Sequence, residues 1–116
     1  MSEPRILQIR TGEGRESGPG IRIWTVSGTR MTMNYVELQP GAVTRLDRHE
    51  NEQLNYVLSG RVEALLGAEG ETRQVLAAGG MVVIPGDVPH RFRVDGEEPA
   101  SFLGIISPAR EPRALA

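Results

Sequence analysis

The stretch PGAVTRLDRHENEQLNYVLSG (residues 40–60), together with GGMVVIPGDVPHRF (residues 79–92), decides the fold of this chain. In both stretches short apolar runs are separated by glycine or proline, as in short strands joined by tight turns. In HRFRV (residues 90–94) the charged Arg91 and Arg93 alternate with apolar residues. Side chains two positions apart share one face of a strand, so we expect one set in a core and the other in solvent.

The same pattern extends outward over most of the chain. The 14 glycines and 8 prolines separate apolar runs along it. These runs are IRIWTVS (21–27), MTMNYVELQ (31–39), AVTRL (42–46), QLNYVL (53–58), RVEALL (61–66), TRQVLA (72–77), MVVIP (81–85), HRFRV (90–94) and SFLGIIS (101–107). RVEALLGAEGE could also be read as a helix, but glycines break it within two turns, so we prefer a hairpin. Eight or nine short strands indicate an all-β sandwich or closed barrel.

Length and composition exclude several classes of function. The formal net charge of −2 argues against nucleic-acid binding, which needs a clustered basic face. The absence of cysteine excludes disulfides, zinc–thiolate sites and thiol nucleophiles. No run approaches the roughly 20 apolar residues of a membrane span, and the start of the chain has no signal-peptide core. We therefore expect a cytoplasmic protein without membrane or nucleic-acid partners.

A chain of 116 residues forms one domain. We place a barrel at residues 19–107, after a flexible or partner-contacting segment (residues 1–18) and before a C-terminal tail (residues 108–116). So short a chain buries only about two-thirds of its unfolded surface, and we therefore expect a homodimer. Four side chains of the first two apolar runs are expected in the core or against a second copy: Trp24, Met31, Met33 and Tyr35.

The two histidines of the chain, His49 and His90, both lie beside predicted strands. By alternation Asp47 points the same way as His49, and Gln53 points the same way as Asn55 on the next strand. Two strands could thus aim oxygen and nitrogen atoms at one point. His90 would supply a further group if the fold brings its strand alongside.

These two stretches resemble the motifs of the cupins, a family of small jelly-roll barrels. The first cupin motif has a Gly, His-x-His, a Glu after three more residues and a closing Gly; the second has Gly, Pro, Gly and a His. The matching positions are Gly41, Gly60, Gly79 or Gly80, Pro85 and His90. The resemblance covers roughly residues 31–107 and implies a single-domain jelly-roll barrel with a metal site at its mouth.

The chain departs from the cupin pattern at two ligand positions. Asp47 stands where the family usually has its first histidine, and Gln53 replaces the usual glutamate, whereas His49 and His90 are kept. Some members, including small uronate-linearising and polyketide-cyclising enzymes, carry Gln in a similar context, which implies that Gln53 can be a ligand. Three imidazoles with one carboxylate carry a charge of −1, and so do the four groups here, so the attraction for a divalent cation is retained. The resemblance thus implies one divalent transition metal (Zn, Mn, Fe, Ni or Co) on Asp47, His49, Gln53 and His90.

The residues around this site suggest a small-molecule pocket. If Asp47 faces inward then so does Arg45, whose guanidinium could bind a substrate carboxylate through a bidentate pair of hydrogen bonds. By the same alternation Asn55 and Phe92 would also contact the substrate. Tyr35 and Glu52 are the candidates for acid or base catalysis. Alternatively, Arg45 lies on the surface or pairs with Asp47, which would leave a pocket without metal.

Three functions fit this reading. The first is a metal-dependent lyase, isomerase or cyclase, in which the cation acts as a Lewis acid on an oxygen-rich small molecule without net redox change. The second is an Fe(II) oxygenase with a site of two histidines and one carboxylate, formed by His49, His90 and Asp47. The third is a non-enzymatic binding module with a degenerate metal site. Fold alone does not decide among them.

Overall fold

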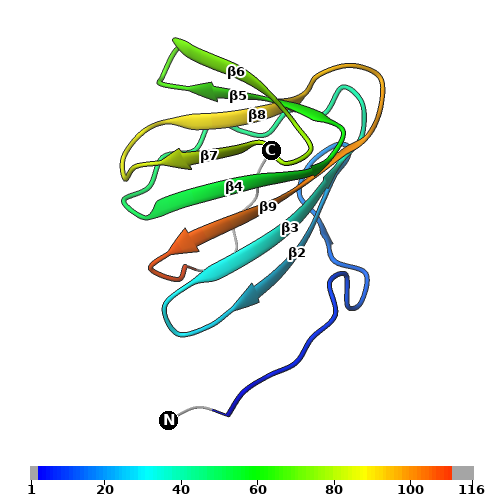
Figure 1. Ribbon diagram of the computed structural model, residues 1–116, viewed down its shortest axis with the longest axis vertical. Helices are drawn as coiled ribbons and strands as arrows, with labels where there is room; N and C mark the ends of the chain where they lie inside the picture. The colour runs from blue at the N-terminus through cyan, green and yellow to red at the C-terminus, as the bar shows by residue number, and fades with distance from the viewer. Residues whose placement is uncertain (1–2, 111–116) are drawn as a thin grey trace.

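The computed structural model describes residues 3–110, and this part of the chain folds into strands without a helix. The strands are β1 (Arg15–Glu16), β2 (Ile21–Ser27), β3 (Thr32–Leu38), β4 (Glu52–Ser59), β5 (Arg61–Leu66), β6 (Thr72–Ala77), β7 (Met81–Ile84), β8 (His90–Val94) and β9 (Ala100–Ser107). The expected all-β jelly-roll fold is confirmed (Figure 1). No helix in the described part of the chain has the length and apolar character that crossing a membrane would require.

Two antiparallel sheets face each other. The larger has the order β1-β2-β3-β9-β4-β7, and the smaller has the order β6-β5-β8 (Figure 1). The segment that could have been helical forms the β5–β6 hairpin, as the glycines in it indicated. Strand β1 lies in the segment that the sequence left without structure, and it pairs with the start of β2.

The expected strand at residues 42–46 is present only as isolated bridges beside β8, between Val43 and Arg93 and between Asp47 and His90. The ladder is interrupted because the Thr44 hydroxyl, rather than a backbone carbonyl, accepts the hydrogen bond from the Phe92 N–H at 2.9 Å. The segment still runs along β8 and extends the smaller sheet by one irregular strand.

The space between the sheets is apolar at one end and polar at the other. Three neighbouring rows of paired residues on β3, β9 and β4 show this change: Val36, Phe102 and Val57; then Asn34, Gly104 and Asn55; then Thr32, Ile106 and Gln53. The apolar end is completed by Ile21, Ile23, Leu38, Val62 and Phe92, all nearly inaccessible to solvent. Burying each such side chain contributes about 1.5–3 kcal/mol. A filled core thus closes one end of the barrel and leaves a polar pocket at the other.

Gly60 shows why the first motif closes on glycine. It joins β4 to β5 with a φ of 72°, and a Cβ there would lie 2.3 Å from the Pro99 carbonyl oxygen. Only glycine avoids both the left-handed strain and this clash.

Candidate metal centre

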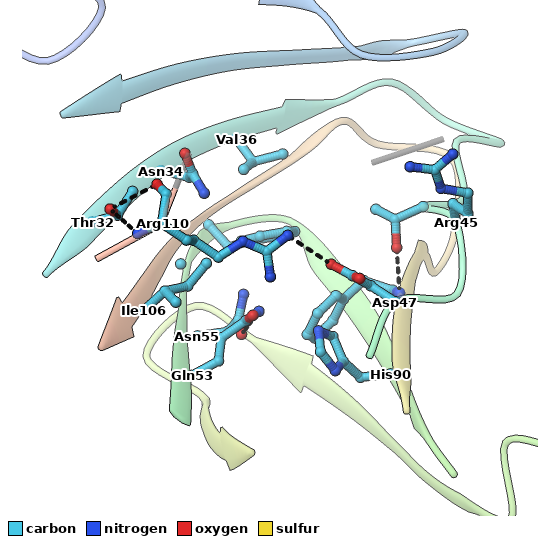
Figure 2. A pocket seen from close by; sticks show the side chains of 14 residues that line it. Thr32, Asn34, Val36, Arg45, Asp47, Gln53, Asn55, His90, Ile106 and Arg110 are labelled. Atoms are coloured by element: carbon cyan, nitrogen blue, oxygen red, sulfur yellow. Dashed lines mark hydrogen bonds and ion pairs between the residues drawn. The ribbon is translucent and has the colours of Figure 1, made fainter. Parts of the chain in front are cut away.

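The polar end of the barrel holds a pocket whose lining comes from both sheets. The lining residues are Thr32, Asn34, Val36, Thr44, Arg45, Asp47, Gln53, Asn55, His90, Phe92, Phe102, Gly104, Ile106 and Arg110 (Figure 2). The free space is about 40 Å³, enough for only a few water molecules, because Arg110 already reaches into it. Ligands larger than this need Arg110 to move or to become part of their binding site.

Asp47, His49 and His90 form a group of three potential metal ligands whose donor atoms lie within 4.8 Å of one another. The backbone brings the first and last of them together, since Asp47 and His90 exchange two N–H···O bonds of 2.9 Å across the bridge. His49 follows two residues later, and the two imidazole rings meet edge to face with centroids 5.0 Å apart. The segment that runs beside β8 therefore brings these three groups together.

In both imidazoles the Nδ1 atom contacts a backbone carbonyl oxygen. The Nδ1 of His90 lies 2.9 Å from the carbonyl oxygen of Val88, and the Nδ1 of His49 lies 3.0 Å from that of Asn51. A carbonyl oxygen only accepts, so each Nδ1 carries the proton and donates it. In a neutral ring with the proton on Nδ1, Nε2 keeps its lone pair, and such backbone contacts are the usual way of orienting a ligating histidine.

Gln53 presents its oxygen to this group. Its Nε2 donates to the Asn55 side-chain oxygen at 2.8 Å, which turns its Oε1 toward the His49 Nε2 at 3.0 Å. In this contact the His49 Nε2 can donate to Oε1; with the ring neutral and its proton on Nδ1 instead, Nε2 and Oε1 would both offer lone pairs to a cation between them. A separation of about 3.0 Å is also the edge of an octahedron with bonds of about 2.1 Å. The donor set of Asp47, His49, His90 and Gln53 therefore fits a divalent transition metal.

Arg110 is the charged pocket residue that the sequence did not reveal. Its Nη2 donates to the Asp47 Oδ2 at 3.5 Å, and both side chains are largely buried, with exposed fractions of 14% and 22%. Its backbone N–H donates to the Thr32 hydroxyl at 3.1 Å, and that hydroxyl donates to the Arg110 carbonyl at 3.2 Å. Figure 2 shows the side chain crossing the pocket from Thr32 to Asp47. Arg110, at the start of the C-terminal tail, thus covers the pocket.

Two buried donors in the pocket have no partner. They are the Nη1 of Arg110 and the Nδ2 of Asn55, and among the described residues they are the buried side-chain polar atoms left without a hydrogen bond. Leaving such donors unpaired costs about 1–3 kcal/mol each, more for a charged group. Because both line one pocket, a ligand with several acceptor oxygens would satisfy both.

The other residues expected at the site divide into two groups. Asn55 and Phe92 line the pocket and are buried, and Arg45 lies exposed at its rim. Tyr35 and Glu52 are not among the lining residues, because their neighbours along β3 and β4 point inward and strand alternation turns these two outward. The structure therefore does not bring either candidate acid or base to the pocket.

Tyr35 instead belongs to the outer face of the larger sheet. Its ring packs against Trp24 with centroids 5.6 Å apart, and its hydroxyl donates to the Glu37 Oε2 at 2.9 Å. Burial raises the pKa of Tyr35, and the Glu37 carboxylate raises it further. A tyrosine in these surroundings stays neutral and serves packing.

The chain belongs to the cupin family, since the Cupin domain model matches residues 34–106. It is 34% identical to polyketide synthase CurC of Streptomyces cyaneus over 90% of this chain and 70% of that protein. It is 31% identical to the 1-methylthio-D-xylulose 5-phosphate methylsulfurylase of Rhodospirillum rubrum over 77% of this chain, but the match spans only 56% of that protein. The structure of KdgF from a Halomonas species is 26% identical, with a TM-score of 0.82 over 94% of this chain and 97% of that one. These relatives confirm the small single-domain cupin that the motifs indicated.

Proposed function

We propose that this cupin is a metal-dependent enzyme of lyase, isomerase or cyclase type that acts on a small, oxygen-rich carboxylic acid. One observation supports this most: three of the four candidate ligands, Asp47, Gln53 and His90, line the same pocket as the two unpaired buried donors, and the fourth, His49, contacts Gln53. Its relatives include proteins named as a methylsulfurylase and as a polyketide synthase, which is consistent with small-molecule chemistry.

Asp47, His49, His90 and Gln53 would hold the ion. A bound divalent cation supplies Lewis acidity, which polarises a carbonyl or stabilises an enolate without redox change. This set of mixed nitrogen and oxygen donors does not select one transition metal over another.

Arg110 and Asn55 would bind and orient the substrate. The Arg110 guanidinium, with Nη1 already unpaired, would take the carboxylate in place of Asp47, and the Asn55 Nδ2 would donate to a second oxygen. Phe92 and Phe102, whose rings pack with centroids 5.2 Å apart, would form an apolar wall beside the substrate. The role that the sequence assigned to Arg45 thus passes to Arg110 in this proposal.

The lining residues include no titratable side chain besides the candidate ligands and the two arginines. A proton would therefore move through water or through the substrate itself, and neither Tyr35 nor Glu52 has a part in it. Fe(II) oxygenase chemistry is the second candidate, because Asp47, His49 and His90 supply two imidazoles and one carboxylate. It differs by consuming oxygen when substrate is present.

The first experiment is a titration of metal-free protein with Zn²⁺ and Mn²⁺ by calorimetry. We expect one ion per chain, and at least 100-fold weaker binding in His49→Ala and Asp47→Asn. Asp95→Asn is the matched control, because Asp95 also pairs with an arginine, Arg61, at 2.9 Å, but on the surface. If the native chain binds no ion, the proposed metal-dependent enzyme is wrong.

The second experiment tests the substrate class. Small hydroxy and keto acids and their neutral amides are compared by thermal shift of the metal-loaded protein. The acids should raise the melting temperature and the amides should not. Equal effects of acids and amides would contradict the role of Arg110.

A further inference from the structure

Gly104 is a glycine in the middle of a strand whose backbone does not require one. It lies on β9, between β3 and β4, and its partners in the two registers are Asn34 and Asn55. Neither ladder shifts at this position, and the φ of Gly104 is not positive. Glycine weakens a strand interior, and where there is no bulge or tight bend it often marks a place where another group approaches the backbone closely.

The space that the missing side chain leaves belongs to the pocket. Gly104 is buried and lines the pocket together with Asn34 and Asn55, and these three residues are here called the pocket floor. A Cβ on Gly104 would lie 3.3 Å from the Asn55 Nδ2, closer than an ordinary van der Waals contact. An alanine would therefore fill the place beside this nitrogen that glycine leaves to a ligand atom.

The side chains of the pocket floor present hydrogen-bond donors. Asn55 is 1% exposed, its Oδ1 accepts a hydrogen bond from the Gln53 Nε2 at 2.8 Å, and its Nδ2 has no partner. The Asn34 Oδ1 accepts a hydrogen bond from the Thr25 hydroxyl at 2.6 Å, so the amide nitrogen is the end of Asn34 that faces the pocket (Figure 2). Both amides thus offer N–H groups to a ligand, and each of their oxygens already accepts a hydrogen bond.

Such a floor distinguishes between oxygen groups. A carbonyl oxygen only accepts hydrogen bonds, whereas a hydroxyl group also donates one and needs an acceptor. The Arg110 Nη1, which also lacks a partner and lines the same pocket, is a further donor. A carbonyl oxygen would satisfy the Asn55 Nδ2 and leave no group of its own unpaired, whereas a methylene group would satisfy nothing.

We propose that the pocket floor binds the carbonyl oxygen of a 2-oxo acid, and that Gly104 determines this specificity by leaving room for it. The carboxylate of the same ligand lies at Arg110, so the inference rests on the proposed function for that residue. The free space is only about 40 Å³, which places the two acceptor groups on neighbouring carbons. The floor lies one row deeper in the barrel than Gln53, about 7 Å along β4, so the amide donors rather than the candidate ligands contact this oxygen.

The binding of three matched acids tests this site. 2-Oxobutanoate, 2-hydroxybutanoate and butanoate are titrated into the native chain and followed by NMR, once without metal and once with Zn²⁺. In both series 2-oxobutanoate should bind at least about 10-fold more tightly than butanoate, as a hydrogen bond to a buried unpaired donor allows, and 2-hydroxybutanoate should lie between them. 2-Oxobutanoate should also shift the side-chain amide signal of Asn55.

Gly104→Ala should reduce the preference for 2-oxobutanoate over butanoate to less than about 2-fold, because the methyl group takes the place of the carbonyl oxygen. Gly80→Ala is the matched control: its φ is not positive either, and its Cβ would lie 3.0 Å from the Leu76 Cβ, but Gly80 does not line the pocket. It should keep the full preference. A native chain that binds no Zn²⁺ contradicts the proposed metal centre, whereas the series without metal tests the pocket floor by itself.

Three results would overturn the inference. One is a native chain that prefers 2-oxobutanoate neither to butanoate nor to 2-hydroxybutanoate. Another is a preference that survives in Gly104→Ala, which would place the oxo group on the metal ion, and the third is a preference that Gly80→Ala removes as well. If Gly104→Ala does not fold, the Asn55 signal of the native chain decides, and a signal that 2-oxobutanoate leaves unchanged rejects the inference.

Discussion

Replacing Arg110 by methionine should have opposite effects on metal and on substrate. The variant removes the guanidinium that pairs with Asp47 at 3.5 Å but keeps a long side chain. The anchoring bonds to Thr32 come from the Arg110 backbone, so the position of the tail should be preserved. A metal ion that binds the Asp47 carboxylate must first displace the Arg110 guanidinium. In the variant there is no guanidinium to displace.

The size of the effect follows from the geometry of the pair. At 3.5 Å the attraction between unit charges is about 5 kcal/mol at an effective dielectric constant of about 20. The lost hydration of two largely buried groups offsets most of it, which leaves a net of about 1.5 kcal/mol. Metal binding should therefore tighten about 10-fold, while the affinity for small carboxylates falls.

Calorimetric titration of metal-free protein with Mn²⁺ measures this change directly. Arg61→Met is the control, because it breaks an arginine–aspartate pair of 2.9 Å that is mostly exposed and distant from the pocket. Its metal affinity should equal that of the native chain. If Arg110→Met binds Mn²⁺ no more tightly than the native chain, or more weakly, the competition between Arg110 and the metal for Asp47 is refuted.

Three further predictions concern the site and the fold. Gln53→Glu should tighten metal binding about 10-fold because it adds a carboxylate, and Gln53→Leu should weaken it about 10-fold because it removes an oxygen donor. Equal metal affinities of the two variants in a calorimetric titration would remove Gln53 from the ligand set. The ultraviolet titration of the native chain minus that of Tyr35→Phe should have its midpoint above the ordinary pKa of about 10, since Tyr35 has a raised pKa. The free energy of unfolding therefore includes a contribution from neutral Tyr35 that is fully present below pH about 10, the ordinary pKa, and is lost as the pH rises through the higher pKa of the folded state. A midpoint at or below 10 would contradict this. Gly60→Ala should lower the free energy of unfolding, measured in urea, by at least about 3 kcal/mol, and Gly79→Ala should lower it by only about 1 kcal/mol. Both glycines have a positive φ, but only at Gly60 would an added Cβ clash, with the Pro99 carbonyl oxygen. Equal losses of stability would refute this clash.

Much of the fold was readable from the sequence because glycine and proline mark the strand ends. The ranges 61–66, 72–77 and 90–94 agree with β5, β6 and β8. The partial strand at 42–46 was harder, since the loss of its ladder depends on a side-chain bond from Thr44 to a segment 48 residues away. Such a contact leaves no local pattern.

The candidate ligands were readable for a related reason. Asp47 and His49 lie in one motif, and Gln53 follows on β4, so alternation and motif spacing placed them together; only the pairing with His90 needed the fold. Glu52 could have been rejected by the same alternation, since it adjoins Gln53. Tyr35 could not, because which face of β3 points inward depends on its pairing with β9.

The role of Arg110 could not be predicted from the sequence for a different reason. The residue lies in a tail without apolar periodicity, and its place in the pocket comes from two backbone bonds to Thr32, 78 residues earlier. The rows of paired residues in the larger sheet illustrate the same limit. Each strand was recognisable by itself, but the rows that run across β2, β3, β9, β4 and β7 appear only when the four registers between these strands are aligned.

Anomalous diffraction from a crystal of the metal-loaded protein would examine the proposed centre atom by atom. We expect one peak per chain, about 2.0–2.3 Å from the Nε2 atoms of His49 and His90, a carboxylate oxygen of Asp47 and the Oε1 of Gln53, with the guanidinium of Arg110 withdrawn from Asp47. Absence of a peak at full metal loading, or a peak bound by other side chains while Arg110 stays on Asp47, would contradict it.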